Sequence, residues 1–166
     1  MTKQKEGREK KYQIIYADPP WAYRDKMKMQ GVHGMIRGAE SFYKTMPLCN
    51  ISDLPIKDIA DKNCSLFLWI TLPLIKEGLR VLEDWGFEYK NCAFNWIKTT
   101  KNGKFHLGMG HYTRGNSELC FLGVRGHPKT INHNVSQIVF SPIGHHSQKP
   151  DIVREKILDL FGDLPR

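Results

Sequence analysis

One short segment combines an acid, two prolines and two aromatic residues at the end of an apolar run. Residues 14–23 read IIYADPPWAY, and the apolar run ends on Asp18. Pro19 and Pro20 fix their φ angles and have no N–H donors. The turn therefore presents acceptors, namely the Asp18 carboxylate and backbone carbonyls, and Trp21 adds a flat apolar face beside them.

A planar ligand with an exocyclic amine, such as the 6-amino group of adenine, suits these residue types. Its ring stacks on Trp21 or Tyr23 while both N–H bonds point at oxygens. Accepting these hydrogens offsets the positive charge that develops when the nitrogen attacks an electrophile. The amine is a weak nucleophile, so its positioning matters more than a strong base. The alternative interpretation is a proline-rich turn with a core tryptophan.

The rest of the chain predicts the elements that must position this turn. Apolar runs predict strands at 12–17, 65–70, 89–98, 118–126 and 137–142. Helical spacing and capping residues predict helices at 47–54, between Thr71 and Gly86, and at 149–161. Strands that alternate with helices indicate an α/β domain with a mainly parallel sheet. Ligands of such sheets bind at the carboxyl ends of the strands, where Asp18 lies.

Length and charge limit the function classes. The 166 residues suit one domain, and the formal net charge of +8 favours a polyanionic partner, nucleic acid first. Residues 1–11 hold five Lys/Arg and predict a mobile basic arm, so the domain is expected at 12–166. Many soluble proteins are basic, however, and charge alone does not decide the matter.

Two long loops are expected, at 24–40 and 99–117. The second loop carries Lys101, Lys104 and Arg114, which are either phosphate contacts or part of a solvated loop. The net charge favours contacts with a nucleic-acid backbone.

The sequence contains no pattern typical of a metal site or of export. The four cysteines form no CxxC pair, and the histidines follow no ligand spacing, so no metal is expected. The charged start of the chain has no signal-peptide core, and no apolar run is long enough for a membrane span. We therefore expect a cytoplasmic protein without a membrane partner.

Several ordered motifs resemble the DPPW-type adenine methyltransferases, the MT-A group. The resemblance covers nearly the whole chain from Tyr12 onward. The motifs are ADPPW (17–21), FYKTM (42–46), LFLWI (66–70), NWIKT (95–99), LGMGHYTRGNSELCFLGVRG (107–126) and HHSQKPD (145–151). The resemblance implies a Rossmann-like fold and transfer of a methyl group from S-adenosylmethionine to the 6-amino group of adenine. The compact chain is similar to bacterial and phage members, which mostly act on DNA, including those of restriction-modification systems.

The same resemblance implies roles for single residues. The carboxylate of Asp18 and the carbonyl of Pro19 would hold the target amine, and Pro20 and Trp21 would complete this catalytic motif. Asp18 would also face the amino group of the cofactor's methionine end. Lys149 would pair with the cofactor's carboxylate.

Further positions follow from the resemblance. Ser147, in the motif of Lys149, would also contact the cofactor. Tyr23 and Tyr43 would line the target-base pocket. Trp69 is expected either in that pocket or in the core, since it lies near the end of a predicted strand.

One departure from the family concerns the residues after DLPR (163–166). Family members continue there with a further strand, which this chain lacks, so we expect the C-terminal strand of the fold to be missing. A second copy or a partner chain would then complete the sheet. The alternatives are a catalytically inactive or partial subunit that binds nucleic acid or an active partner, and an RNA adenine methyltransferase.

Overall fold

The computed structural model describes residues 10–22, 44–110 and 112–166. Most of the predicted basic arm, the predicted loop at 24–40, and both Tyr23 and Tyr43 lie outside these ranges. The elements in chain order are β1 (Tyr12–Ala17), α1 (Leu48–Ser52), α2 (Ile56–Ile59), β2 (Ala60–Ile70), a 3₁₀ turn (Leu72–Leu74), α3 (Ile75–Asp84), β3 (Glu88–Thr99), β4 (Ser117–Arg125), β5 (Ile138–Pro142) and α4 (Ile152–Phe161).

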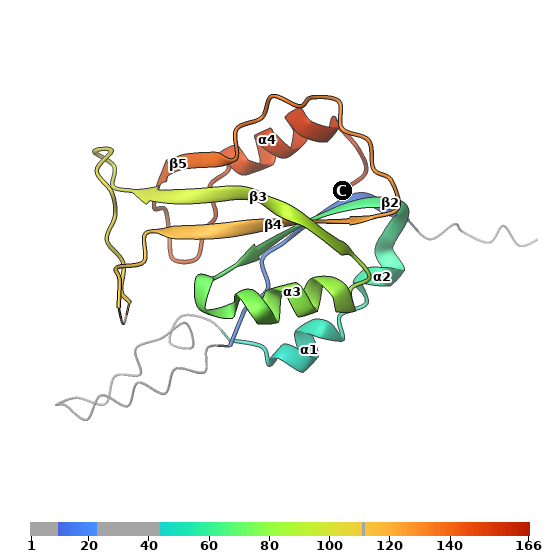
Figure 1. Cartoon of the computed structure of the whole chain (residues 1–166), viewed down its shortest axis with the longest axis horizontal. Coiled ribbons are helices and arrows are strands. Elements are labelled where there is room, and N and C mark those ends of the chain that lie inside the picture. The colour runs from blue at the N-terminus through green and yellow to red at the C-terminus, as the bar shows by residue number, and fades with distance from the viewer. Residues whose placement is uncertain (1–9, 23–43, 111) are drawn as a thin grey trace, which may run out of the picture.

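The described strands form one mixed sheet of order β1-β2-β4-β3-β5 (Figure 1). β1 pairs with β2 in parallel and β3 pairs with β5 in parallel, whereas β4 runs antiparallel to both of its neighbours. The α/β prediction is confirmed. The expected mainly parallel arrangement is wrong at the central strand, because β4 follows β3 as its antiparallel neighbour, and strand periodicity carries no information on direction.

The core has two layers because strand β2 is buried on both faces. Leu66, Leu68 and Ile70 pack toward α1 and α3, whereas Phe67 and Trp69 pack toward α4. This alternation follows from the two-residue period of a strand. A strand covered on both sides reads as a continuous apolar run, which is how LFLWI is recognised in the sequence.

The helices differ from prediction at two points. The helix expected at 47–54 ends after α1, and a separate turn, α2, follows Pro55, because a residue before proline disfavours helical ψ. Thr71 precedes a 3₁₀ turn and its side chain makes no capping hydrogen bond. Gly86, with φ of 80°, follows α3 as predicted.

The fold brings five chain segments to one edge of the sheet. β1, β2, β3 and β5 share one direction, so their carboxyl ends meet there together with the amino end of β4, at the left-hand end of the sheet in Figure 1. This edge, called the catalytic edge below, carries Asp18, Lys98, Glu118 and Lys149.

The last residues of the chain run beside the outer edge of β1. The backbone N–H groups of Gln13 and Ile14 donate to the Pro165 carbonyl, at 2.8 and 3.2 Å. That a second chain completes the sheet stays a prediction. The helices within the described ranges are too short and too polar to cross a membrane.

Candidate active site

An ion pair joins the two residues that the motifs single out most strongly. Lys149 Nζ lies 2.8 Å from Asp18 Oδ2, although 131 residues separate the two in the chain. Asp18 directly follows β1, and Lys149 lies between β5 and α4. The structure therefore brings together the predicted amine acceptor and the predicted cofactor cation.

Lys149 has further partners besides Asp18. Its ammonium lies 3.4 Å from Glu118 Oε2, donates to the Ser147 carbonyl at 3.3 Å, and sits 5.7 Å from the centroid of the Trp69 ring. The lysine side chain is only 13% exposed. Two carboxylates, a carbonyl and a tryptophan face thus hold one ammonium group in a half-buried position.

The other oxygen of Glu118 pairs with a second lysine. Lys98 Nζ contacts Glu118 Oε1 and lies 5.1 Å from the centroid of the Trp96 ring. Trp69 and Trp96 pack edge to face, with centroids 6.3 Å apart. Asp18, Lys149, Glu118 and Lys98 form what we call the charge network, in which two cations lie over two packed indole rings.

Burial and neighbouring charges shift the pKa values in this network. Burial raises the pKa of Asp18, the Lys149 ammonium opposes that shift, and the Glu118 carboxylate adds to it. Burial lowers the pKa of Lys149, but the charges of Glu118 and Asp18 together outweigh it, so the pKa lies above its usual value. Lys149 is therefore charged at neutral pH, and Asp18 is a stronger proton acceptor than a solvated aspartate.

Backbone contacts hold the Asp-Pro-Pro-Trp turn in place. The Pro19 carbonyl accepts a hydrogen bond from the Trp21 N–H at 2.9 Å, and the Pro20 carbonyl accepts one from Met46 at 2.8 Å. A carbonyl oxygen has two lone pairs, and the contact with Trp21 uses one of the two on the buried Pro19. Asp18 projects beyond this fixed turn.

Two tryptophans that were candidates to offer a ring face to the target base are core residues. Trp21 is 4% exposed and its Nε1 donates to the Trp69 carbonyl at 3.1 Å. Trp69 is 1% exposed and its Nε1 donates to Tyr16 Oη at 2.7 Å. Among the described contacts, these indoles anchor the turn and support Lys149, and neither offers an open ring face to a base.

Ser147 takes part through its backbone. Its φ of 64° lies in the left-handed region, which non-glycine residues adopt rarely. This conformation aims the Ser147 carbonyl at Lys149. The predicted contact of Ser147 with a cofactor stays a proposal.

The connection between β3 and β4 is a hydrogen-bonded loop rather than an irregular one. Gly108 N–H donates to the Gly115 carbonyl at 2.8 Å, and a Cβ on Gly108 would lie 2.4 Å from that oxygen, so only glycine fits. Lys101 and Lys104 are exposed at its first turn. Arg114 Nη1 lies 3.5 Å from the Gly108 carbonyl.

Sequence reasoning missed Glu118 and Lys98. Glu118 opens the apolar run of β4, and Lys98 lies near the end of β3. Each is a charged residue at a strand end, which is the signal that identified Asp18. The direction of β4 was needed to see that Glu118 lies at the same edge as Asp18.

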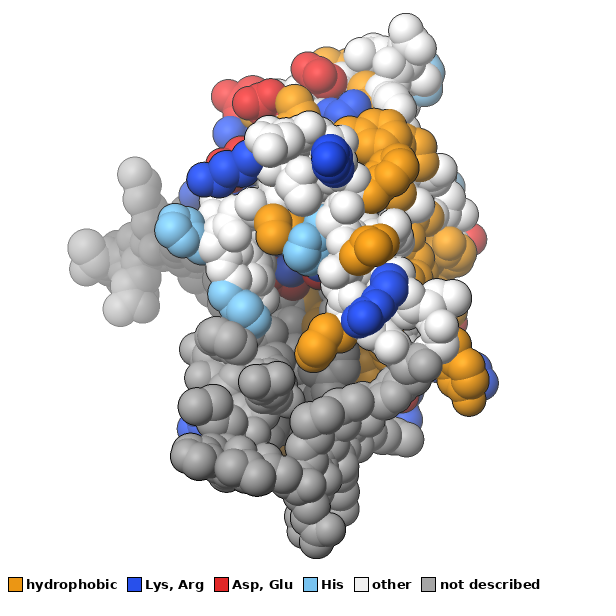
Figure 2. Space-filling view, turned by 90° about the vertical axis from the view of Figure 1, so that its left-hand side faces the viewer, with side chains coloured by type: hydrophobic (Ala, Val, Ile, Leu, Met, Phe, Trp, Pro, Cys, Tyr) orange, Lys and Arg blue, Asp and Glu red, His pale blue; other side chains and the backbone are white. Residues whose placement is uncertain are grey.

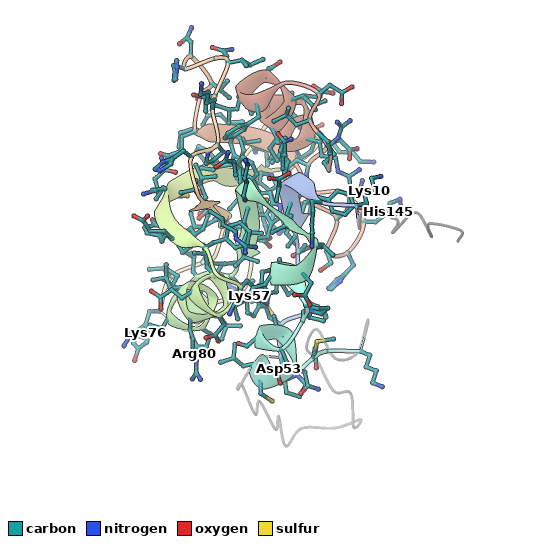
Figure 3. All side chains as sticks on the ribbon, turned by 90° about the vertical axis from the view of Figure 1, so that its right-hand side faces the viewer. Lys10, Asp53, Lys57, Lys76, Arg80 and His145 are labelled. Carbon is teal, nitrogen blue, oxygen red and sulfur yellow. The ribbon has the colours of Figure 1, made fainter. Side chains whose placement is uncertain are left out.

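A hollow away from the charge network lies on the helical side of the molecule. It has a volume of about 510 Å³ and is lined by α1, α3 and the connection between them, including Asp53, Lys57 and Arg80, which Figure 3 shows on the helical side. It contains none of the predicted site residues, and its lining balances acids and bases. Within the described ranges, no three His, Cys, Asp or Glu side chains gather as a metal site would require.

Comparison with known proteins adds independent findings. A model of the MT-A70 family matches residues 12–164. The chain is 34% identical over 170 residues to the type II methyltransferase M.MunI of a Mycoplasma species, covering 95% of this chain and 70% of that relative. It is 26% identical over 159 residues to the human N(6)-adenosine-methyltransferase catalytic subunit METTL3, covering 94% of this chain and 23% of that relative.

Proposed function

Since the chain belongs to the MT-A70 family, we propose that it is an S-adenosylmethionine-dependent methyltransferase that acts on the 6-amino group of adenine in DNA. The similarity to M.MunI, a type II methyltransferase, supports DNA as substrate and a place in a restriction-modification system. The similarity to METTL3 concerns an N(6)-adenosine-methyltransferase and supports the same target atom. The chain spans less than a quarter of METTL3, so only the methyl-transfer chemistry is inferred from that relative.

The observation that carries this proposal is the Asp18–Lys149 pair at the catalytic edge. The Asp18 carboxylate and the Pro19 carbonyl are oxygen acceptors next to each other in the chain, and they suit the two N–H bonds of an exocyclic amine. Methyl transfer would form the nitrogen–carbon bond as the carbon–sulfur bond of the sulfonium donor breaks and a neutral thioether leaves. The amine nitrogen would gain positive charge and then lose a proton to solvent. Acceptors that the protein already places beside the amine stabilise that charge with less reorganisation than solvent would need.

The same cluster fits the amino-acid end of the cofactor. S-adenosylmethionine supplies an electrophilic methyl group when it is bound. Its methionine end carries an ammonium and a carboxylate, and the cluster offers the carboxylates of Asp18 and Glu118 beside the ammonium of Lys149. Lys149 would hold the carboxylate, close to the amino end of α4, which also favours anions.

The β3–β4 loop is the proposed surface for the nucleic-acid backbone. The segment 99–117 contains no acidic residue, and Lys101, Lys104 and Arg114 would contact phosphates. Phe105 and Tyr112 are exposed on the same loop, and exposed aromatic rings are suited to stacking with unpaired bases. Figure 2 faces this end of the molecule, where basic, histidine and hydrophobic side chains lie beside one another.

A target adenine inside a duplex must leave the base stack before its amine can react. Tyr23 and Tyr43 remain the proposed residues of the pocket that would receive it. Both lie outside the described residues, so this part of the proposal rests on the resemblance alone.

Methyl transfer to defined nucleic acids tests the proposal. The chain is incubated with S-adenosylmethionine labelled in its methyl group and, in separate arms, duplex DNA, single-stranded DNA and RNA of the same sequence. We expect label in DNA and not in oligonucleotides in which adenine is replaced by purine, which lacks the amine. Label in RNA alone would establish the RNA enzyme instead, and no label in any arm would favour the non-catalytic subunit.

A further inference from the structure

Two carboxylates share the ammonium of Lys149. Asp18 Oδ2 is 2.8 Å from Lys149 Nζ, and Glu118 Oε2 is 3.4 Å from it. In the proposed reaction Asp18 must turn from the lysine to the target amine. Glu118 is then the protein carboxylate that still holds the lysine in place, so that its ammonium stays where the cofactor's carboxylate can reach it.

Glu118 is fixed well enough to be that partner. It is the second residue of β4, its backbone pairs with Trp96 in β3, and its side chain is 18% exposed. Its other oxygen contacts Lys98, which lies over the Trp96 ring. Glu118 therefore has one oxygen held by Lys98 and one oxygen directed at Lys149.

We propose that Glu118, held by Lys98, is a positioning residue. It keeps the Lys149 ammonium over the Trp69 ring when Asp18 leaves the lysine and turns to the target amine. This inference rests on the proposed methyl transfer for its purpose, but the shared ion pair itself is independent of activity. Glu118 acts through Lys149 and Asp18 and does not touch the reacting atoms.

Electrostatics predict the direction in which the pKa of Asp18 changes when the Glu118 charge is removed. A purely structural role of Glu118 would not predict that direction. Asp18 faces Lys149, Glu118, and, from β1 and β4, Tyr16 and Cys120. The Glu118 charge raises the pKa of Asp18 and offers Lys149 a second carboxylate at 3.4 Å. Without that charge Lys149 pairs with Asp18 alone, which lowers the pKa of Asp18 and keeps its oxygen occupied.

The first test measures Asp18 itself by ¹³C NMR of its carboxyl carbon during a pH titration. In Glu118→Gln, which keeps the shape and removes the charge, we expect the Asp18 midpoint to move to lower pH. Glu88→Gln is the matched control, because Glu88 also pairs with a lysine, Lys90, but at the opposite end of β3. We expect the control to leave the midpoint of Asp18 unchanged.

The second test is kinetic. Glu118→Gln is expected to lower kcat by up to about 100-fold through misplacement of the Asp18 and Lys149 groups, and to move the acid limb of the kcat profile to lower pH. Glu118→Asp keeps the charge and is expected to recover part of kcat. Circular dichroism of each variant confirms that it is folded.

The outcomes separate this inference from the proposed function. An unchanged Asp18 midpoint in folded Glu118→Gln, or an upward shift, would overturn the positioning role even if the wild-type chain methylates DNA. A downward shift in a chain that methylates no nucleic acid would support the ion-pair geometry and contradict the proposed function.

Discussion

Asp18 is the residue on which the proposed chemistry depends. It directly follows β1, precedes a turn that backbone hydrogen bonds hold in place, and lies 2.8 Å from Lys149. The prolines and the tryptophan act through the backbone they fix, because Trp21 is buried and donates its indole N–H to the Trp69 carbonyl. A charged acceptor on a rigid turn is the arrangement that stabilises charge on a reacting amine.

Removing the Asp18 carboxylate should nearly abolish methyl transfer. We expect Asp18→Ala to lower kcat about 100- to 1000-fold, the usual cost of losing one preorganised group that stabilises charge. Asp18→Asn should also fail when its amide presents N–H groups to the amine. The measurement is single-turnover transfer to adenine-containing DNA, with circular dichroism as the control for folding. Near-wild-type turnover in either folded variant would contradict the assignment.

The pH dependence follows from the raised pKa of Asp18. The ionised form is needed to accept the amine, so activity should fall as the pH falls through a midpoint above the ordinary aspartate value of about 4. The free energy of unfolding changes with pH in the opposite direction to activity, because the folded state binds the Asp18 proton more tightly than the unfolded state does. The stabilisation from this proton is present at low pH and is lost as the pH rises through the raised pKa. A kcat profile from pH 4 upward checks the first statement. An acid limb at or below pH 4 would show that burial does not raise the pKa of Asp18.

Among the secondary-structure elements, β2 and α3 set the position of the catalytic edge. Gly78 of α3 lies against Ile70, the last residue of β2, and a Cβ on Gly78 would come within 2.3 Å of Ile70 Cδ1. The helix can approach the end of the strand this closely only because Gly78 has no side chain.

Gly78→Ala therefore tests how tightly this helix and strand are packed. We expect a net decrease in the free energy of unfolding, because overpacking costs about 1–3 kcal/mol and alanine regains at most roughly 1 kcal/mol over glycine in helix propensity. Urea denaturation followed by circular dichroism measures it, with Lys76→Ala in the same helix as the control. A more stable Gly78→Ala variant would mean that Ile70 moves aside freely.

The elements show which parts of the structure the sequence could predict. The five strands were expected within a few residues except at β2, whose exposed start, Asp61 to Asn63, carries no apolar signal. The resemblance assigned Asp18 and Lys149 to the same end of the cofactor, and the ion pair between them was not predicted. Three-dimensional pairing determines the break after α1, the direction of β4 and the charge network. Glu118 and Lys98 were therefore missed. The sequence also left open whether Trp69 is buried.

Taken as a whole, the molecule is a basic chain whose acid-free β3–β4 loop lies at the same edge as Asp18. Association with DNA should therefore depend on salt through this loop. The helical side, with Lys57, Lys76 and Arg80, carries the same kind of charge on a different face (Figure 3). Replacing three cations on the helical side therefore changes the net charge by the same amount as replacing three cations on the β3–β4 loop.

Replacing Lys101, Lys104 and Arg114 with glutamine should weaken DNA binding and flatten its salt dependence. Each lost phosphate contact reduces the slope of log K against log salt by about 0.9 for duplex DNA. The matched control replaces Lys57, Lys76 and Arg80 and should leave the slope nearly unchanged. Fluorescence anisotropy at several salt concentrations measures both. Equal slopes in the two triple variants would place the β3–β4 loop outside the interface.

Mass spectrometry of the nucleosides from DNA treated with the chain and S-adenosylmethionine tests the proposed function as a whole, because it identifies the methylated atom. The account predicts N6-methyladenine after incubation with the wild-type chain and a loss of at least about 100-fold with Asp18→Ala. A product methylated at another atom, no N6-methyladenine with the wild-type chain, or equal amounts with both proteins would contradict it.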